Sequence, residues 1–251
     1  MRFASLGSGS RGNALVVESA ETRLLIDCGF GPRQLAQRLA RLRLAPEDFH
    51  AIIVTHEHQD HASGVAACAR RYGLQVLLTH GTASQIALDG VDFKVIDAHR
   101  PIEVFGLGLQ PMPVPHDARE PVQFVVSDGA VRLAILTDAG CVTEHMCATV
   151  SGCDAIVIEC NHDADMLANS RYPESLKRRI AGSYGHLENA AAAELLARID
   201  RQHLRHVIAA HLSQENNRPQ LARAALAEIL GCEPGWIGVA EQETGFDWRQ
   251  T

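Results

Sequence analysis

The segment IIVTHEHQDHASGV constrains the fold of this chain more than any other stretch. Its apolar start, at 52–54, predicts a buried strand, and its end predicts the start of a helix. Between strand and helix, within six residues, lie four side chains of metal-binding type: His56, His58, Asp60 and His61. Because strand ends lie at the rim of a sheet, where binding sites form, the fold has to keep this rim accessible.

Spacing within this segment predicts a metal site. His56 and His58 are two residues apart, so in an extended segment they project to the same side and can share one ion, at roughly 2.0–2.1 Å. Asp60 and His61 lie where the helix begins and can hold a second ion. Histidine and carboxylate ligands suit zinc, manganese or iron. A solvated polar turn is the alternative, but such a density of ligand types disfavours it.

Two ions need about seven or eight protein ligands, so other strand ends have to supply partners. Four segments have the required form, a short apolar strand followed by an acid or a histidine: LLIDCG, PMPVPHDA, LAILTDAG and VIAAHLSQENN. Taken singly, such residues are more often turn residues or helix caps. Taken together with the histidine segment, they predict four further members of the site: Asp27, His116, Asp138 and His211.

A second motif suggests a different function. Gly7, Gly9 and Gly12 spell GxGxxG, the pattern of a dinucleotide-binding turn, and Asp27 lies near the distance expected for a ribose ligand. That turn has to lead directly into a helix, whereas Gly12 precedes the strand pattern NALVVES. We therefore expect no dinucleotide cofactor, and a glycine-rich loop between two strands. Its small residues would let the loop lie close to the metal site, with three polar side chains near substrate: Ser8, Ser10 and Asn13.

Bulk properties narrow the class of protein. The chain has no apolar run of 18 residues and no signal-peptide pattern, so we expect a cytoplasmic protein with no membrane span. Its seven scattered cysteines, with no CxxC spacing, are typical of a reduced enzyme. A net charge of −7 argues against a protein that binds nucleic acid through a large positive surface. An enzyme that contacts a few phosphates locally remains an alternative.

Periodicity predicts a mixed α/β architecture, an αββα sandwich formed by residues 1–251 as one domain. Short apolar or alternating runs predict strands at 2–6, 14–18, 23–27, 51–54, 75–78, 92–96, 109–114, 122–126, 131–136, 155–159 and 206–210. Helical patterns occupy 32–43, 62–72, 82–88, 143–149, 173–181, 188–200 and 218–230.

The order of these motifs resembles the metallo-β-lactamase superfamily, and the match runs from Asp27 to His211. The resemblance implies the metallo-β-lactamase fold and two divalent ions, Zn²⁺ or Mn²⁺. It implies that Asp138 bridges both ions and that Asp27 orients the histidine segment without binding metal. It assigns His56, His58 and His116 to one ion and Asp60, His61 and His211 to the other.

Within the superfamily, the resemblance favours the nucleases. True zinc β-lactamases commonly have a cysteine where Asp138 stands, and VPHDARE differs from the GHTPG-like segment of glyoxalase II. The stretches GSGSRGNA, THEHQDH, ECNHD, GHLEN and HLSQENN together look most like the YycJ/WalJ group of 5′ to 3′ exonucleases that act on double-stranded DNA. A small-molecule phosphodiesterase or a glyoxalase II-like thiolester hydrolase of the same fold stays open as the alternative.

Phosphodiester hydrolysis also requires an acid for the leaving oxygen, beside a hydroxide activated by two metals. We predict Asp60, His186 and His162 as catalytic residues, with His186 at a helix start whose free N–H groups favour an anion. A cap or packing role is the alternative for either histidine. The basic run LKRR, 177–179 with Leu176, would follow a DNA backbone if it faced the site. Three residues of the last motif are weaker candidates for phosphate contact: Ser213, Asn216 and Asn217.

Overall fold

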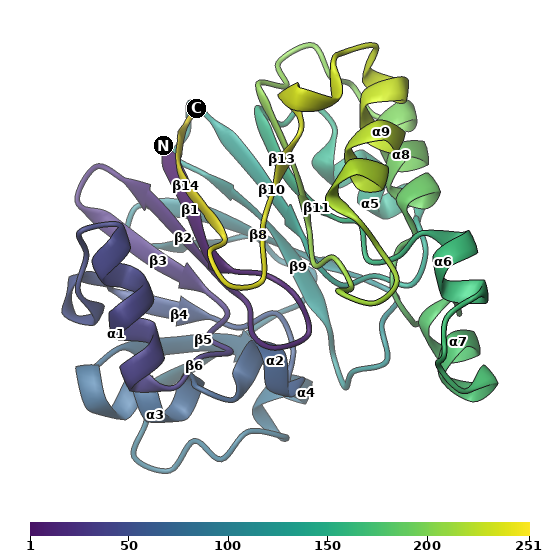
Figure 1. Ribbon diagram of the computed structural model, residues 1–251. Coiled ribbons are helices and arrows are strands. Elements are labelled where there is room, and N and C mark those ends of the chain that lie inside the picture. The colour runs from purple at the N-terminus through teal and green to yellow at the C-terminus, as the bar shows by residue number, and fades with distance from the viewer.

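Two seven-stranded sheets lie face to face in the computed structural model, which describes residues 1–251 (Figure 1). The first sheet has the order β14 (Phe246–Gln250), β1 (Arg2–Gly7), β2 (Ala14–Ser19), β3 (Thr22–Ile26), β4 (Ala51–Ile53), β5 (Gln75–Thr79) and β6 (Phe93–Ile96). The second has the order β13 (Gly238–Val239), β12 (His206–Ala210), β11 (Ala155–Glu159), β10 (Arg132–Leu136), β9 (Val122–Ser127), β8 (Leu107–Pro113) and β7 (Ile102–Val104).

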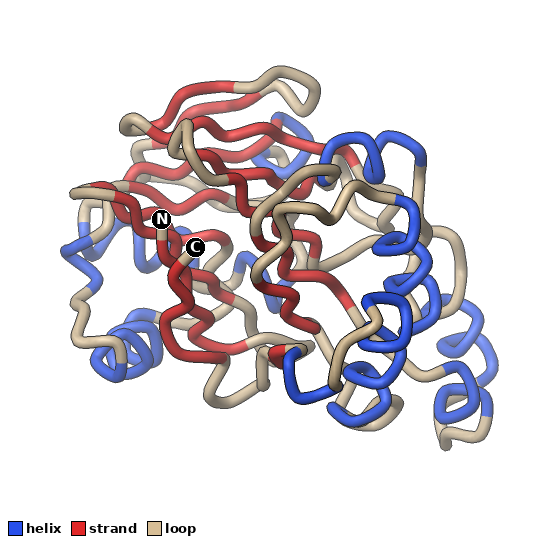
Figure 2. Tube along the Cα trace, turned by 90° about the horizontal axis from the view of Figure 1, so that it is seen from above, coloured by secondary structure: helices blue, strands red, loops and turns tan.

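Helices cover the outer face of each sheet, so the predicted αββα sandwich is confirmed (Figure 2). On the first sheet lie α1 (Pro32–Arg41) and α3 (Val65–Tyr72), and on the second lie α5 (Glu144–Val150), α8 (Asn189–Arg198) and α9 (Pro219–Leu230). Apolar side chains from both inner faces form the layer between the sheets. No helix combines the length and the apolar character needed to cross a membrane. The short helices are α2 (Gln59–Ala62), α4 (His80–Ala83), α6 (Ala164–Ala168), α7 (Glu174–Ile180) and two 3₁₀ turns, Pro46–Asp48 and Pro234–Trp236.

Each sheet is half antiparallel and half parallel, and the parallel halves create the site. Strands β3 to β6 are parallel, as are β10 to β13. Because parallel strands end at the same edge of a sheet, the residues that follow β3, β4, β10, β11 and β12 all come to one edge of the sandwich. Predicted site residues Asp27, Asp138 and His211 follow β3, β10 and β12.

The predicted strands lie within two residues of their observed bounds, and two predicted helices differ from the observed ones. The helix predicted at 62–72 is α3, which starts three residues later, after the short helix α2; between the two, the N–H of Gly64 donates to the carbonyl of Cys28 (2.9 Å). The helix at 82–88 is the single turn α4, which starts earlier because the Thr79 hydroxyl accepts from the N–H of Thr82 (3.4 Å). Ser84 then donates to a turn carbonyl and competes with helix continuation. Four short elements were not predicted: β7, β13, β14 and α6.

The loop beside the predicted metal segment is too tightly packed to accept a side chain at Gly29. A Cβ at Gly29 would lie 1.9 Å from the carbonyl oxygen of Asp60. A backbone hydrogen bond holds the two segments together beside Gly29: Cys28 donates its N–H to the His61 carbonyl (2.8 Å). Gly31, two residues on, has no atom within 4 Å of the corresponding position. Gly29 therefore sets the distance between the end of β3 and the segment that carries Asp60.

We expect Gly29→Ala to destabilise the protein by about 1–3 kcal/mol, because the backbone of Asp60 has to move to make room. Thermal and denaturant unfolding would measure the loss. Gly31→Ala is the matched control and should change the free energy of unfolding little. Equal stability of the two variants would contradict this account of the packing.

Candidate metal centre

All seven predicted ligand side chains come together at the edge where the parallel strands end. Their ligand atoms form overlapping groups within 4.8 Å of one another. Among these groups are His56, His58 and His116; His56, His61 and Asp138; and Asp60, His61 and His211. The sequence separates these residues by up to 155 positions, so the fold alone creates the cluster.

In the first group, outer hydrogen bonds fix which nitrogen of each ring carries a hydrogen. His116 has its Nδ1 2.9 Å from the carbonyl oxygen of Gly185, and His58 has its Nε2 3.2 Å from that of Asp117. A carbonyl oxygen only accepts, so each of these nitrogens donates, and the other nitrogen of each neutral ring bears a lone pair. Those two nitrogens, Nε2 of His116 and Nδ1 of His58, face each other at 3.2 Å.

A cation fits between these facing nitrogens. His56 adds a third: its Nδ1 lies 2.9 Å from the Thr55 hydroxyl, and its fully buried Nε2 has no hydrogen-bond partner. Burial lowers the pKa of His56 well below its ordinary value, which keeps the ring neutral. Buried polar atoms without partners are rare in folded proteins and call for an explanation. Three converging imidazole lone pairs are the donor set that zinc and similar ions prefer.

The second group is built in the same way. His61 has its Nδ1 2.8 Å from Asp27, and His211 has its Nδ1 3.0 Å from Glu159, so both rings turn Nε2 toward the cluster. Asp60 Oδ2 lies 3.3 Å from Nε2 of His61 and 3.2 Å from Nε2 of His211. Burial alone would lower the pKa of His61, but nearby carboxylates raise it well above its ordinary value.

Asp138 lies between the two groups. Its Oδ2 is 2.9 Å from Nε2 of His61 and its Oδ1 is 3.8 Å from Nε2 of His116. The carboxyl is fully buried, and Oδ2 has no partner of hydrogen-bond geometry. Burial opposes its ionisation, yet His211 and His61 hold its pKa well below its ordinary value. The structure thus presents a buried carboxylate in the place where a residue shared by two ions is expected.

Asp27 lies behind the histidine segment and contacts it through three hydrogen bonds. It accepts from the Thr55 N–H (2.8 Å), from the Thr55 hydroxyl (2.8 Å) and from Nδ1 of His61. Asp27 has φ 61°, the left-handed conformation that few residues other than glycine, asparagine and aspartate adopt. This conformation lets the Asp27 side chain, at the end of β3, reach Thr55, which follows the neighbouring strand β4. His211, with φ 54°, is the other site residue in this conformation.

Glu159 is the member of the site that the sequence did not single out. It ends β11, is fully buried, and accepts from Nδ1 of His186 (2.8 Å) as well as from His211. Its other oxygen accepts from the N–H groups of Ala139 (2.9 Å) and Leu187 (3.2 Å). The sequence signal that could have identified Glu159 is its position: it directly follows the apolar strand AIVI and begins the stretch ECNHD. Its oxygens are already occupied by these donors, so Glu159 orients the histidines.

The glycine-rich loop joins β1 to β2, so the strand predicted after Gly12 is confirmed. Asn13 donates its N–H to the carbonyl of Asp60 (2.7 Å) and its side-chain amide to Asp60 Oδ2 (3.1 Å). Ser8 accepts from the N–H of His211 (2.9 Å). Ser8 and Asn13 are therefore buried supports of predicted ligands, whereas Ser10 faces an open cavity.

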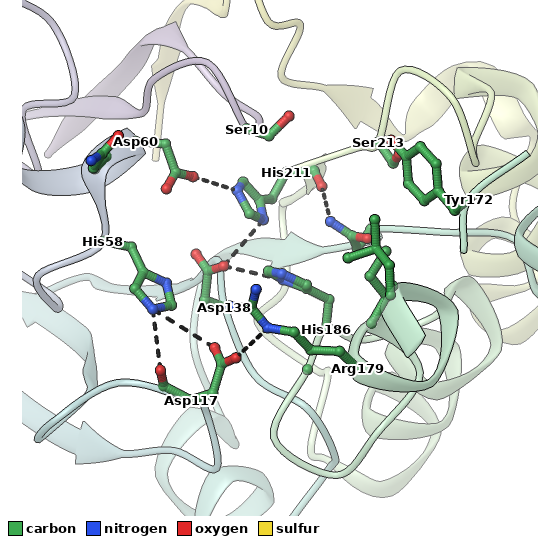
Figure 3. A pocket seen from close by; sticks show the side chains of 15 residues that line it. Ser10, His58, Asp60, Asp117, Asp138, Tyr172, Arg179, His186, His211 and Ser213 are labelled. Carbon is green, nitrogen blue, oxygen red and sulfur yellow. Dashed lines mark hydrogen bonds and ion pairs between the residues drawn. The ribbon is translucent and has the colours of Figure 1, made fainter. Parts of the chain in front are cut away.

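An open cavity of about 520 Å³ lies over the cluster (Figure 3). Its lining includes His58, Asp60, Asp138, His186, His211, Ser10, Ser213 and four residues of one segment, Tyr172, Leu176, Arg179 and Ile180. A family model described as the β-lactamase superfamily domain matches residues 22–211. The chain belongs to this superfamily.

Two relatives cover nearly the whole chain. Exodeoxyribonuclease YycJ of Bacillus anthracis is 36% identical over 96% of this chain and 92% of its own length. Exodeoxyribonuclease WalJ of Streptococcus pneumoniae is 32% identical over 95% of this chain and 91% of its own length. Within the superfamily, the chain therefore belongs to the family of these enzymes.

Solved structures agree on the fold. The metallo-β-lactamase fold protein YhfI from Bacillus subtilis has a TM-score of 0.77 at 15% identity, with 100% of this chain and 99% of that chain covered. Zn²⁺-bound PqqB from Methylobacterium extorquens has a TM-score of 0.72 at 20% identity, with both chains fully covered. The metallo-β-lactamase fold predicted from the motifs is confirmed.

The two predicted catalytic histidines differ in position. His186 lines the cavity, and although burial alone would lower its pKa, Glu159 and Asp138 raise it to about 11. It does not start a helix as expected: α8 begins at Asn189, and the nearby N–H of Leu187 is taken by Glu159. His162 is buried and lines only a neighbouring cavity of about 340 Å³, which His186 also lines, and burial lowers the pKa of His162 to about 4.

Of the three predicted phosphate contacts, the structure brings only Ser213 to the cavity. Asn216 and Asn217 are buried because their side chains hold the loop together. Asn216 donates its amide to the Ser213 hydroxyl (3.3 Å), and Asn217 donates to the carbonyl of Cys160 (2.7 Å) and to Asn189 (2.9 Å). Polar side chains after a strand can hydrogen-bond within their own loop instead of facing a cavity, as those of Asn216 and Asn217 do.

We expect Glu159→Gln to lower the affinity for Zn²⁺ by about 10- to 100-fold, because two histidines lose the anion that orients them. Titration against a competing chelator would measure the change, with thermal unfolding recorded on the same samples. Glu228→Gln, on the exposed face of α9, is the control. Unchanged affinity in Glu159→Gln would contradict the orienting role.

Proposed function

We propose that the protein is a metal-dependent exonuclease that degrades double-stranded DNA in the 5′ to 3′ direction. The observation that carries the proposal is the pair of ligand groups joined by Asp138 at the floor of an open cavity. Relatives named exodeoxyribonucleases, at 36% and 32% identity over nearly the full chain, support DNA as the substrate. The cavity is lined by polar residues, with three apolar ones among fifteen, as a charged substrate requires.

In this proposal two divalent ions, Zn²⁺ or Mn²⁺, occupy the cluster. One is held by His56, His58 and His116, the other by Asp60, His61 and His211, and Asp138 belongs to both. When bound, such ions lower the pKa of water and neutralise charge on the attacked phosphate. The facing imidazole nitrogens and the unpartnered buried atoms His56 Nε2 and Asp138 Oδ2 support this assignment.

His186 is the residue that we assign to protonation of the leaving oxygen. Its Nδ1 is engaged by Glu159 and Asp138, so Nε2 is the nitrogen available to a substrate in the cavity. His162 lacks this access, which favours a packing role for it. Ser213 lies on the opposite side of the cavity from His58 in Figure 3, and we assign its hydroxyl to contact with a phosphate oxygen.

We also infer one domain over residues 1–251 and a cytoplasmic location. Both sheets contribute to the same inner apolar layer and to the same ligand cluster, which supports a single unit. Seven cysteines, all free thiols, suit a reducing compartment.

The proposal predicts that the purified protein, supplied with Mn²⁺ or Zn²⁺, shortens a labelled 5′-phosphorylated DNA duplex from its 5′ ends. Chelation should abolish the reaction and added metal should restore it. His58→Ala should lose bound metal and activity together. Hydrolysis of bis-p-nitrophenyl phosphate with DNA and RNA left intact would replace the proposal with a small-molecule phosphodiesterase, and turnover of S-lactoylglutathione would favour a thiolester hydrolase.

A second prediction concerns the proton for the leaving oxygen. His186→Asn should lower kcat on DNA by about 10²- to 10⁴-fold, because an alkoxide leaving group needs an acid. The same variant should lose far less activity on bis-p-nitrophenyl phosphate, whose leaving group departs without a proton. His162→Asn is the control and should retain kcat on DNA if it is stably folded, as judged by thermal unfolding. An equal loss by His186→Asn on both substrates would exclude the acid role.

A further inference from the structure

One wall of the cavity comes from a single segment, residues 172–180, which ends in α7. Leu176, Arg179 and Ile180 lie three and four residues apart, so they share one face of the helix, and this face lines the cavity. Tyr172 lines the same wall just before the helix. In Figure 3 Tyr172 lies across the cavity from His58 and Asp60, and Arg179 extends toward Asp117.

Arg179 is held in place by a contact that leaves most of its donors free. Its Nε donates to Asp117 Oδ2 at 2.6 Å, and the carbonyl of Asp117 accepts from Nε2 of His58. A guanidinium has five N–H donors, and this contact uses the one on Nε. The side chain is 63% exposed, so the pair adds little stability. The contact instead fixes the position of the guanidinium relative to a predicted metal ligand.

The charge of the cavity makes Arg179 unusual. Three aspartates line the cavity, and Arg179 is its one lysine or arginine, in a chain of net charge −7. The neighbouring cations of the LKRR run do not take part: Lys177 donates to the carbonyl of Ala168 and pairs with Glu174, and Arg178 does not line the cavity. A guanidinium with free N–H donors beside a phosphodiesterase centre has the planar geometry that can bind two phosphate oxygens at once.

Tyr172 adds a flat apolar surface to the same wall. It is the one aromatic side chain other than histidine among the lining residues. Bases stack on such rings whatever their identity. The cavity, at about 520 Å³, is within the roughly 300–1,000 Å³ typical of small-ligand pockets, so it suits one nucleotide better than a length of duplex.

We propose that residues 172–180 bind the terminal nucleotide of the DNA strand, with Arg179 on a phosphate and Tyr172 against the base. This inference rests on the proposed nuclease function and adds the substrate-binding element to it. It explains how an acidic protein holds a polyanion: a single placed cation and the ligand cluster act locally, without a broad basic surface.

The experiment compares Arg179→Gln with its neighbour Arg178→Gln on a 5′-phosphorylated duplex. Arg179→Gln should raise KM by about tenfold with a smaller change in kcat, and should reduce the slope of log KM against log salt by about one. Arg179→Lys should recover part of the loss. Arg178→Gln should match wild type, and all variants should retain their metal content and unfolding temperature.

Equal KM values for Arg179→Gln and Arg178→Gln would overturn the phosphate contact. A loss of metal in Arg179→Gln would also overturn it, because the residue would then act by supporting His58 through Asp117. If wild type leaves DNA intact, the proposed function fails, and KM for bis-p-nitrophenyl phosphate in the same variants still decides whether Arg179 binds a phosphate diester.

Tyr172 is tested with a substrate that lacks the base. Tyr172→Ala should raise KM about tenfold for an ordinary duplex and leave KM unchanged for a duplex whose terminal nucleotide is abasic. Tyr184→Ala, an exposed tyrosine that does not line the cavity, is the control and should match wild type on both substrates. An equal effect of Tyr172→Ala on both duplexes would overturn the base contact.

Discussion

The buried carboxylate of Asp27 is the contact on which the rest of the site depends. It accepts hydrogen bonds from Thr55 and from Nδ1 of His61, and the Thr55 hydroxyl in turn lies 2.9 Å from Nδ1 of His56. One anion thereby sets the orientation of two rings that would otherwise rotate. A buried charge is stable only when such donors surround it, so the network and the fold of the loop require each other.

Glu159 has the same role in the second sheet. It is fully buried at the end of β11 and holds Nδ1 of His211 and of His186, as Asp27 holds that of His61. Each sheet thus contributes one anion that turns imidazole rings toward the centre, and Asp138 lies in the gap between them. The geometry of the predicted metal site depends on how these two sheets pack, because each of its two predicted three-residue ligand groups takes residues from both sheets.

Local patterns were sufficient to predict the strands and to select seven side chains that the fold brings together, since both depend on residues that are adjacent in the chain. They were insufficient for Glu159, whose role is visible only beside His186 and His211, which lie 27 and 52 residues away. They were also insufficient to predict that Asn216 and Asn217 are buried. An amide after a strand looks alike whether it faces a cavity or the interior, and here both face the interior.

The sequence by itself determined the superfamily and the sandwich of two sheets, and it predicts the metal ligands, because dense histidine spacing and strand periodicity are local properties. The tertiary structure decided which ring nitrogen faces the centre, that His186 and not His162 reaches the cavity, and that Arg179 is the one basic residue of the LKRR run that lines it. These outcomes depend on hydrogen-bond partners and on the packing of two sheets, and residues far apart in the chain supply both.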